Sequence, residues 1–148
     1  MATLRDDVVP ILERSPLFLG YSRNEIKKLA EEFDEQTFMA DRGVITEGRH
    51  GMEFFLILEG EALVHQDGTE LARLEPGDFF GEVAALDDGP RTASVRTVTQ
   101  VRCLGLPNGT FRGFLERNPR FAINVLHAIV RRFRAVVTLA PQKAQTTS

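Results

Sequence analysis

The sequence lacks several features that would place it in an easily recognised class of protein. Its 148 residues contain one cysteine, Cys103, so no disulfide can form within the chain, and a small core residue is expected there. No run approaches the roughly 18 apolar residues that would span a membrane, and the N-terminus has no apolar stretch of signal-peptide length. The net charge of −3 argues against a nucleic-acid-binding domain, which is usually basic. A cytoplasmic protein is the simplest expectation.

Signatures of catalytic and metal sites are also missing from the sequence. The histidines, His50, His65 and His127, lie far apart, and none belongs to an H-x-H pair. A metal centre of the kind that barrel-shaped metalloenzymes build from clustered histidines and carboxylates is therefore not expected. No G-x-S-x-G motif supports a serine nucleophile. We expect no enzymatic activity, no metal and no cofactor.

The residue pattern changes along the chain and divides it into regions. Residues 3–33 are predicted to form helices, with a capping box at Ser22–Glu25. From 35 to 106, short apolar runs alternate with glycine-bearing turns, which predicts strands. From 108 to 139 the apolar spacing is helical again. The tail, 140–148, is polar and without pattern, and we expect it to be disordered.

The central region predicts the fold class, which is mainly β with flanking helices. About eight short strands at close spacing are typical of an antiparallel barrel or jelly roll, in a single domain over residues 1–148. In the helical regions, Asp7 is expected to cap a first short helix with Pro10 in its first turn, and the last helix is expected from Pro119 to about Leu139. The expected strands lie at 37–39, 44–46, 54–58, 62–65, 71–74, 78–80, 93–98 and 101–106.

The most informative stretch runs from Phe79 to Val95, FFGEVAALDDGPRTASV. It predicts a strand that ends at Gly81, one or two helical turns, a tight turn and a second strand. The glycine allows close approach of the backbone to a ligand, and the first N–H groups of a short helix favour an anion. Arg91 offers a planar fork suited to phosphate, whereas Glu82 can accept hydrogen bonds from hydroxyls such as those of a ribose. Together these features indicate a nucleotide with one phosphate.

Two pieces of this stretch, Phe80-Gly81-Glu82 and Pro90-Arg91-Thr92-Ala93, closely resemble the phosphate-binding cassette of the cyclic nucleotide-binding domain family. That family includes the catabolite activator protein, the regulatory subunits of cyclic-AMP-dependent kinase and nucleotide-gated channels. The eight residues between Glu82 and Arg91 match the kinase and channel members, and the resemblance extends over about residues 15–135. It implies an eight-stranded antiparallel β-roll, N-terminal helices that move with ligand state, and a C-terminal lid helix.

The resemblance also implies a role for each cassette residue. Gly81 and Ala84 would offer backbone contacts, and Glu82 would take the ribose 2′-hydroxyl. Arg91 would pair with the cyclic phosphate, beside the N–H and hydroxyl of Thr92. The alternative for Glu82 and Arg91 is a structural ion pair across a turn. The expected ligand-binding residues are Gly81, Glu82, Val83, Ala84, Arg91, Thr92 and Ala93.

Base preference is left open by Thr92. Family members that prefer cyclic GMP often carry threonine at this position, while small modules of bacterial character more often bind cyclic AMP. Cyclic AMP is therefore the predicted ligand, with cyclic GMP as the alternative. The base needs an apolar or stacking cover, for which the last helix offers Ile129, Arg132 and Phe133. For each of these three, packing in the core or at an interface is the competing interpretation.

The last helix carries more apolar residues than one domain surface needs. One stripe is expected to cover the barrel, and the other to meet a partner helix, as a homodimer or an effector contact. The first stripe comprises Ala122, Leu126, Ile129, Phe133, Val136 and Ala140, and the second comprises Ile123, Val130 and Val137.

The basic residues near the last helix have two interpretations, a solvated helix face or a nucleic-acid contact. Relatives of the catabolite activator protein read DNA through a helix-turn-helix that follows this helix, and only eight residues follow Ala140 here, so DNA binding is not expected. We predict a sensor that couples nucleotide occupancy to movement of the last helix. The alternatives are an interaction module with the same fold and no bound nucleotide, and a DNA-binding regulator that acts through a partner chain. The basic residues are Arg117, Arg120, Arg131, Arg132 and Arg134.

Overall fold

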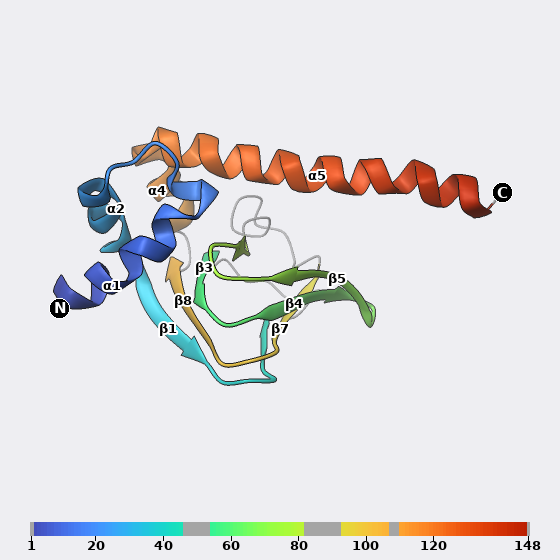
Figure 1. Cartoon of the computed structure of the whole chain (residues 1–148), viewed down its shortest axis with the longest axis horizontal. Helices are drawn as coiled ribbons and strands as arrows, with labels where there is room; N and C mark the ends of the chain where they lie inside the picture. The colour runs from blue at the N-terminus through green and yellow to red at the C-terminus, as the bar shows by residue number, and fades with distance from the viewer. Residues whose placement is uncertain (1, 46–53, 82–92, 107–109, 148) are drawn as a thin grey trace.

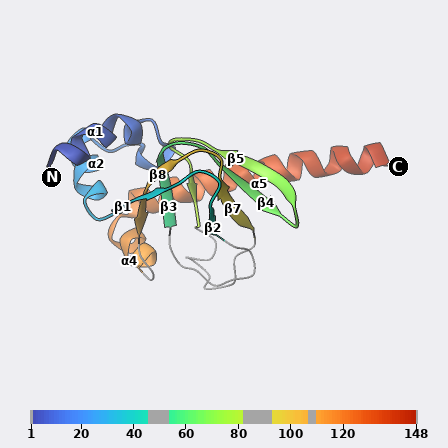
Figure 2. The same ribbon diagram turned by 90° about the horizontal axis from the view of Figure 1, so that it is seen from below.

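The computed structural model describes residues 2–45, 54–81, 93–106 and 110–147 and shows a β-roll with helices against it (Figure 1). The helices α1, α2 and α4 gather at one end of the roll, while α5 runs along it and extends beyond the β4–β5 hairpin (Figures 1 and 2). The helical elements are α1 (Ala2–Glu13), the 3₁₀ turn η1 (Pro16–Phe18), α2 (Arg23–Ala30), α4 (Thr110–Arg117) and α5 (Pro119–Thr147). The strands are β1 (Asp34–Phe38), β2 (Gly43–Ile45), β3 (Phe54–Glu59), β4 (Ala62–Gln66), β5 (Thr69–Leu74), β6 (Phe79–Phe80), β7 (Ser94–Thr97) and β8 (Val101–Leu106).

The strands form two antiparallel sheets of four strands each. The first sheet has the order β1-β8-β3-β6, and the second has the order β2-β7-β4-β5. A strand was found in each of the regions where the apolar runs predict one, so the predicted antiparallel roll with flanking helices is confirmed.

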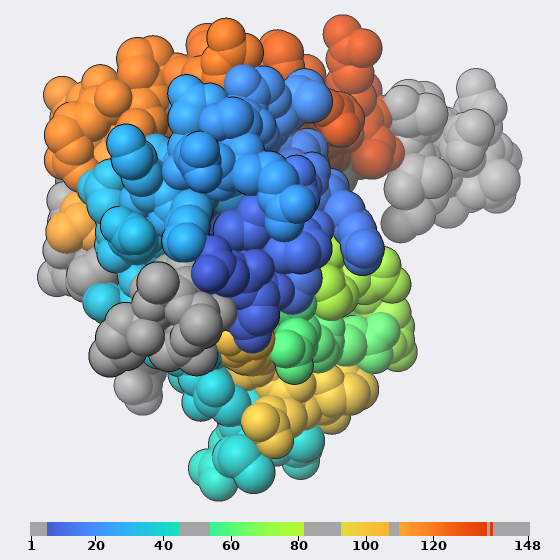
Figure 3. All heavy atoms as spheres, turned by 60° about the vertical axis from the view of Figure 1, so that its left-hand side comes forward, coloured from blue at the N-terminus to red at the C-terminus, as the bar shows by residue number. Residues whose placement is uncertain are grey.

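Strand β3 is buried on both faces and separates two apolar clusters. Because side chains alternate across a strand, Phe54 and Leu56 join the cluster under the helices, whereas Phe55 and Ile57 point into the roll. The cluster under the helices also receives Phe18, Phe33, Phe114 and Phe121. The interior cluster contains Phe80, Val95 and the fully buried Cys103, which confirms Cys103 as a small core residue. Figure 3 shows α1 and α2 covering one side of the molecule.

Local sequence signals explain the start of α2 but not the extent of α1. At α2, the Ser22 hydroxyl accepts a hydrogen bond from the Glu25 N–H at 3.2 Å, and the Ser22 N–H donates to Glu25 Oε1 at 2.8 Å, so the capping box is confirmed. The expectation that Asp7 caps the first helix is wrong, because α1 begins at Ala2 and contains Pro10. Burial of Val8 and Leu12 stabilises the helix on both sides of this proline.

The end of the last helix also differs from the expectation. Helix α5 continues to Thr147, so the predicted end near residue 139 and the predicted disorder of 140–147 are wrong. The sequence after Pro141 contains Gln142, Lys143 and Ala144, which are good helix formers. The helix continues through Pro141 although an interior proline removes a backbone donor and crowds the carbonyl four residues before it.

Candidate functional site

The described residues include the two ends of the predicted cassette. Strand β6 ends at Phe80, and Gly81 follows with a φ of 91°, a left-handed conformation that glycine adopts without steric cost. The expectation that the strand stops at Gly81 is therefore confirmed. Ala93 lies just before β7 and is half-buried. The chain thus leaves the first sheet at Gly81 and enters the second sheet at Ser94.

The middle of the cassette lies outside the described residues. This applies to Glu82, Val83, Ala84, Arg91 and Thr92, whose expected contacts with phosphate, ribose and base stay predictions. The flanking residues Gly81 and Ala93 lie next to the ends of β6 and β7, which belong to different sheets, and their contacts with a ligand stay predictions as well.

Strand β6 is held firmly by its neighbours in the first sheet. Its residues pair with β3, Phe79 opposite Leu56 and Phe80 opposite Phe55. The rings of Phe80 and Phe55 stack with their centroids 5.0 Å apart inside the roll. On the opposite face, the Phe79 ring lies 5.6 Å from that of Phe54. Both side chains of β6 are buried, so the strand that leads into the cassette is closely packed against its neighbours.

The turn before β6 is tied to the N-terminal helices. Gly77, with a φ of 94°, donates its N–H to the carbonyl of Ile57 at 2.8 Å, and Ile57 donates to the carbonyl of Asp78 at 2.9 Å. The buried hydroxyl of Ser15 donates to the carbonyl of Gly77 at 3.0 Å and accepts from the N–H of Leu17 at 3.3 Å. One serine therefore caps η1 and connects it to the turn.

The three candidate lid residues on α5 have different surroundings. Ile129 is half-buried and packs against the cluster under the helices, and Phe133 is 66% exposed. Arg132 reaches β6: its Nη2 donates to the carbonyl oxygen of Phe79 at 2.6 Å, and its guanidinium carbon lies 3.9 Å from the centroid of the Phe79 ring. Arg132 is thus the candidate that contacts the strand leading into the cassette.

The buried face of α5 differs from both predicted stripes. Phe121, Val125 and Ala128 are buried against the neighbouring elements, and neither stripe contains them. The expectation that one of the stripes covers the barrel is wrong, although Ile129 packs at the edge of the buried face. Apolar residues occur around most of this helix, so periodicity alone does not select one face. The exposed apolar residues are Ile123, Leu126, Val130, Phe133 and Val137.

Asn124 is a functional candidate that the sequence analysis missed. It is 7% exposed and lies on the buried face of α5, where its side-chain amide donates to the carbonyl of Leu17 at 2.9 Å and to that of Leu19 at 3.0 Å. These bonds attach α5 to η1. The signal that could have identified Asn124 is its place in the sequence, where it is a polar residue within a run of apolar ones. A buried polar residue usually makes specific hydrogen bonds.

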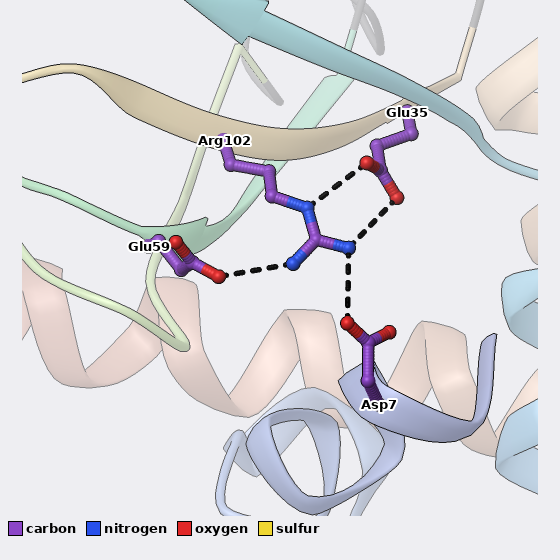
Figure 4. A network of polar contacts seen from close by, with 4 residues as sticks. All are labelled: Asp7, Glu35, Glu59 and Arg102. Atoms are coloured by element: carbon purple, nitrogen blue, oxygen red, sulfur yellow. Dashed lines mark hydrogen bonds and ion pairs between the residues drawn. The ribbon is translucent and has the colours of Figure 1, made fainter. Parts of the chain in front are cut away.

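Three carboxylates converge on a single guanidinium away from the cassette ends (Figure 4). Arg102 contacts Glu35, Glu59 and Asp7, so the acidic groups are paired with a cation rather than arranged around an empty position. Within the described ranges, no group of three histidine, cysteine or acidic residues is placed to hold a metal ion. No helix in the described part of the chain is long and apolar enough to cross a membrane.

Comparison with known proteins shows to which family the chain belongs. The sequence model of the family described as "Cyclic nucleotide-binding domain" matches residues 35–118, from β1 to the residue after α4. The chain belongs to the cyclic nucleotide-binding domain family. The resemblance seen in Phe80-Gly81-Glu82 and Pro90-Arg91-Thr92-Ala93 is therefore confirmed at the level of the family.

Relatives are found among bacterial and fungal proteins. The chain is 30% identical over 129 residues to the CRP-like cAMP-activated global transcriptional regulator of Mycobacterium tuberculosis, covering 84% of this chain and 58% of that regulator. It is 39% identical over 106 residues to the cAMP-dependent protein kinase regulatory subunit of Emericella nidulans, covering 70% of this chain and 26% of that subunit. The crystal structure of the Thermus thermophilus catabolite activator protein matches with a TM-score of 0.79 at 28% identity, covering 88% of this chain and 63% of that one. The chain thus spans less than two thirds of each relative.

Proposed function

We propose that this protein is a cyclic nucleotide sensor that binds cyclic AMP and converts occupancy into a change in the position of α5. The observation that carries the proposal is the geometry at Gly81, where a closely packed strand ends in a left-handed glycine within the F-G-E … P-R-T-A motif. The family match over residues 35–118 includes this motif. The printed names of the mycobacterial and fungal relatives, which refer to cAMP, support the choice of ligand.

The proposed ligand-binding residues occupy one segment between β6 and β7. Gly81 and Ala84 supply backbone contacts, Glu82 accepts from the ribose 2′-hydroxyl, and Arg91 pairs with the cyclic phosphate. Val83, Thr92 and Ala93 complete the set. In this proposal the whole chain, residues 1–148, is one regulatory domain without catalytic activity, and cyclic AMP is its ligand rather than a cofactor.

Calorimetric titration with cyclic AMP and then cyclic GMP tests the proposal. Wild-type protein freed of co-purified nucleotide should release or absorb heat with cyclic AMP and bind it more tightly than cyclic GMP. Arg91→Ala should weaken binding by about thirtyfold or more, because truncating one member of a desolvated charged pair costs roughly 2–5 kcal/mol. Arg96→Ala is the matched control, since Arg96 is exposed on β7 and pairs with Asp41. Folded wild-type protein that gives no heat with either nucleotide would overturn the proposal.

The exposed apolar stripe on α5 favours a second candidate function, an interaction module that dimerises through this helix. Ile123, Leu126, Val130, Phe133 and Val137 are 41–66% exposed, and their alternating spacing of three and four residues is that of the contact positions in a coiled coil. Sedimentation with and without cyclic AMP distinguishes the two candidates. A dimer that forms regardless of nucleotide, in protein that gives no binding heat, would favour the interaction module.

A further inference from the structure

Helix α5 contacts the buried Phe79 of strand β6 through two kinds of interaction. The Nη2 of Arg132 donates to the Phe79 carbonyl at 2.6 Å, and the guanidinium lies over the Phe79 ring at 3.9 Å. Phe79 lies directly before Phe80, the first residue of the cassette motif. A hydrogen bond weakens as the donor–acceptor distance grows and as the angle at the hydrogen falls toward about 120°. A rotation of the peptide after Phe79 would therefore weaken the bond and change the preferred position of Arg132.

The ring of Phe79 cannot easily absorb such a movement. It packs 5.6 Å from Phe54, whose ring in turn stacks on Phe111 of α4 with the centroids 4.2 Å apart. All three rings are buried. Since close-packed interiors transmit displacement rather than dissipate it, a shift of β6 must be accommodated at a contact that is less confined. Arg132 is only half-buried and offers such a contact.

A second connection between α5 and the same segment is more rigid. Asn124 of α5 donates to the carbonyl of Leu17 in η1 and to that of Leu19, which follows η1. Ser15 connects η1 to the Gly77 carbonyl, two residues before Phe79. Asn124 and Ser15 are buried, and losing a bond to either would leave polar groups unsatisfied away from water. Asn124 precedes Arg132 by eight residues, a separation of about 12 Å along the helix axis. Helix α5 is thus attached through the buried Asn124 at one point and through the half-buried Arg132 at another.

We propose that Arg132 is the positioning residue that couples β6 to α5, so that cassette occupancy and docking of α5 stabilise each other through the Arg132–Phe79 contact. This inference rests on the proposed nucleotide-binding function. The ligand favours the β6 conformation in which the Phe79 carbonyl faces Arg132, and α5 then docks by pivoting near Asn124. By linkage, a mutation that removes the contact weakens ligand binding by the same factor by which the ligand strengthens docking.

The chemistry of the side chain makes the role specific to arginine. A planar guanidinium can donate to the carbonyl while its face lies on an aromatic ring. Arg132→Lys keeps the positive charge but loses this combined geometry, so it should restore coupling only partly. Arg132→Gln removes the charge and the stacking plane. Arg134→Gln is the matched control, because Arg134 is exposed on the same helix and its loss changes net charge equally.

Hydrogen–deuterium exchange of the full chain, followed in peptides over residues 125–137, tests the coupling together with calorimetry. In the wild type and in Arg134→Gln, saturating cyclic AMP should slow exchange in these peptides. Arg132→Gln should bind cyclic AMP about threefold to tenfold more weakly, and its α5 peptides should keep their ligand-free exchange rates even at saturation. Arg132→Lys should lie between them.

The outcomes separate this inference from the proposed function. No binding heat in the wild type would overturn the proposed function and the coupling with it. Binding by the wild type and by Arg132→Gln, with equal slowing of exchange in α5 at saturation, would overturn the coupling through Arg132 and leave the sensor function standing.

Discussion

Arg102 and Glu35 form a two-pronged ion pair on the helix-covered side of the first sheet. The Nε of Arg102 lies 2.9 Å from Glu35 Oε2, and its Nη2 lies 3.1 Å from Oε1 (Figure 4). The same guanidinium donates to Glu59 at 3.0 Å and lies 3.5 Å from a carboxylate oxygen of Asp7. The hydrogen bond to Glu35 is the main cause that raises the pKa of Arg102 above its ordinary value. The cluster joins β1, β3 and β8 to α1.

Arg102→Met should lower the free energy of unfolding by about 1–3 kcal/mol, because it removes the two hydrogen bonds that Arg102 donates to the partly buried carboxylate of Glu35. Only 18% of the Arg102 side chain and 30% of the Glu35 side chain are exposed, so solvent screens this pair less than an ordinary surface pair. Urea denaturation measures the loss. Arg96→Met is the control: its pair with Asp41 is open to solvent, and its loss should change stability little. Equal effects of the two substitutions would contradict a special role for Arg102.

Ser15→Ala should destabilise the protein by about 1–3 kcal/mol, since it removes the cap of η1 and leaves the Gly77 carbonyl without a buried donor. Thermal or urea unfolding provides the measurement. The matched variant is Ser22→Ala, which removes the exposed cap of α2 and should cost about 1 kcal/mol. A smaller loss at Ser15 than at Ser22 would show that the bond to the β5–β6 turn contributes nothing to stability.

Features encoded over a few neighbouring residues were predictable from the sequence. The Ser22–Glu25 capping box is one example, and the end of a strand at Gly81 is another. Cys103 was likewise predictable as a small core residue, because it stands in a strand-like apolar run. These signals depend on spacings of two to four residues along the chain, which a single sequence displays directly.

Contacts between distant segments could not be predicted in this way. Ser15 and Gly77 are 62 residues apart, and Arg132 and Phe79 are 53 apart. Each contact depends on how helices and strands pack against one another after they have formed. The buried face of α5 was missed for the same reason: Phe121 and Val125 compete with Leu126 and Phe133 for the core, and the shape of the neighbouring surface decides between them.

The capping box at α2 predicts a dependence of stability on pH. The hydrogen bonds from the Ser22 backbone and side chain lower the pKa of Glu25 below its ordinary value of 4.5. Because the folded state holds the ionised form, the stabilisation is fully present above pH 4.5 and is lost as the pH falls through the lower folded-state value. Comparing urea unfolding of the wild type and Glu25→Gln from about pH 3 to pH 7 measures this. The difference in the free energy of unfolding between the wild type and Glu25→Gln should shrink as the pH falls. A difference that grows as the pH falls would contradict the capping interaction.

Two glycines with similar backbone conformations provide a test of close packing at the turn between β3 and β4. Gly60, between β3 and β4, has a φ of 95°, and Gly68, between β4 and β5, has a φ of 80°. An added Cβ at Gly60 would lie 2.2 Å from the carbonyl oxygen of Gln100, whereas one at Gly68 would meet nothing within 4 Å. Alanine at either position must adopt a left-handed conformation, which costs about 1–2 kcal/mol. Gly60→Ala should therefore destabilise by about 3 kcal/mol or more, since it adds a backbone clash to that strain.

The difference between the two variants isolates the clash, because the conformational strain is common to both. Gly68→Ala should lose only about 1–2 kcal/mol in urea unfolding. If the two variants lose equal stability, the close approach of the Gln100 carbonyl to Gly60 does not add to the cost of the substitution. The left-handed turn conformation alone would then explain why glycine is needed at position 60. If Gly60→Ala loses clearly more, the β3–β4 turn packs against the β7–β8 connection, which holds the two sheets together at this end of the roll.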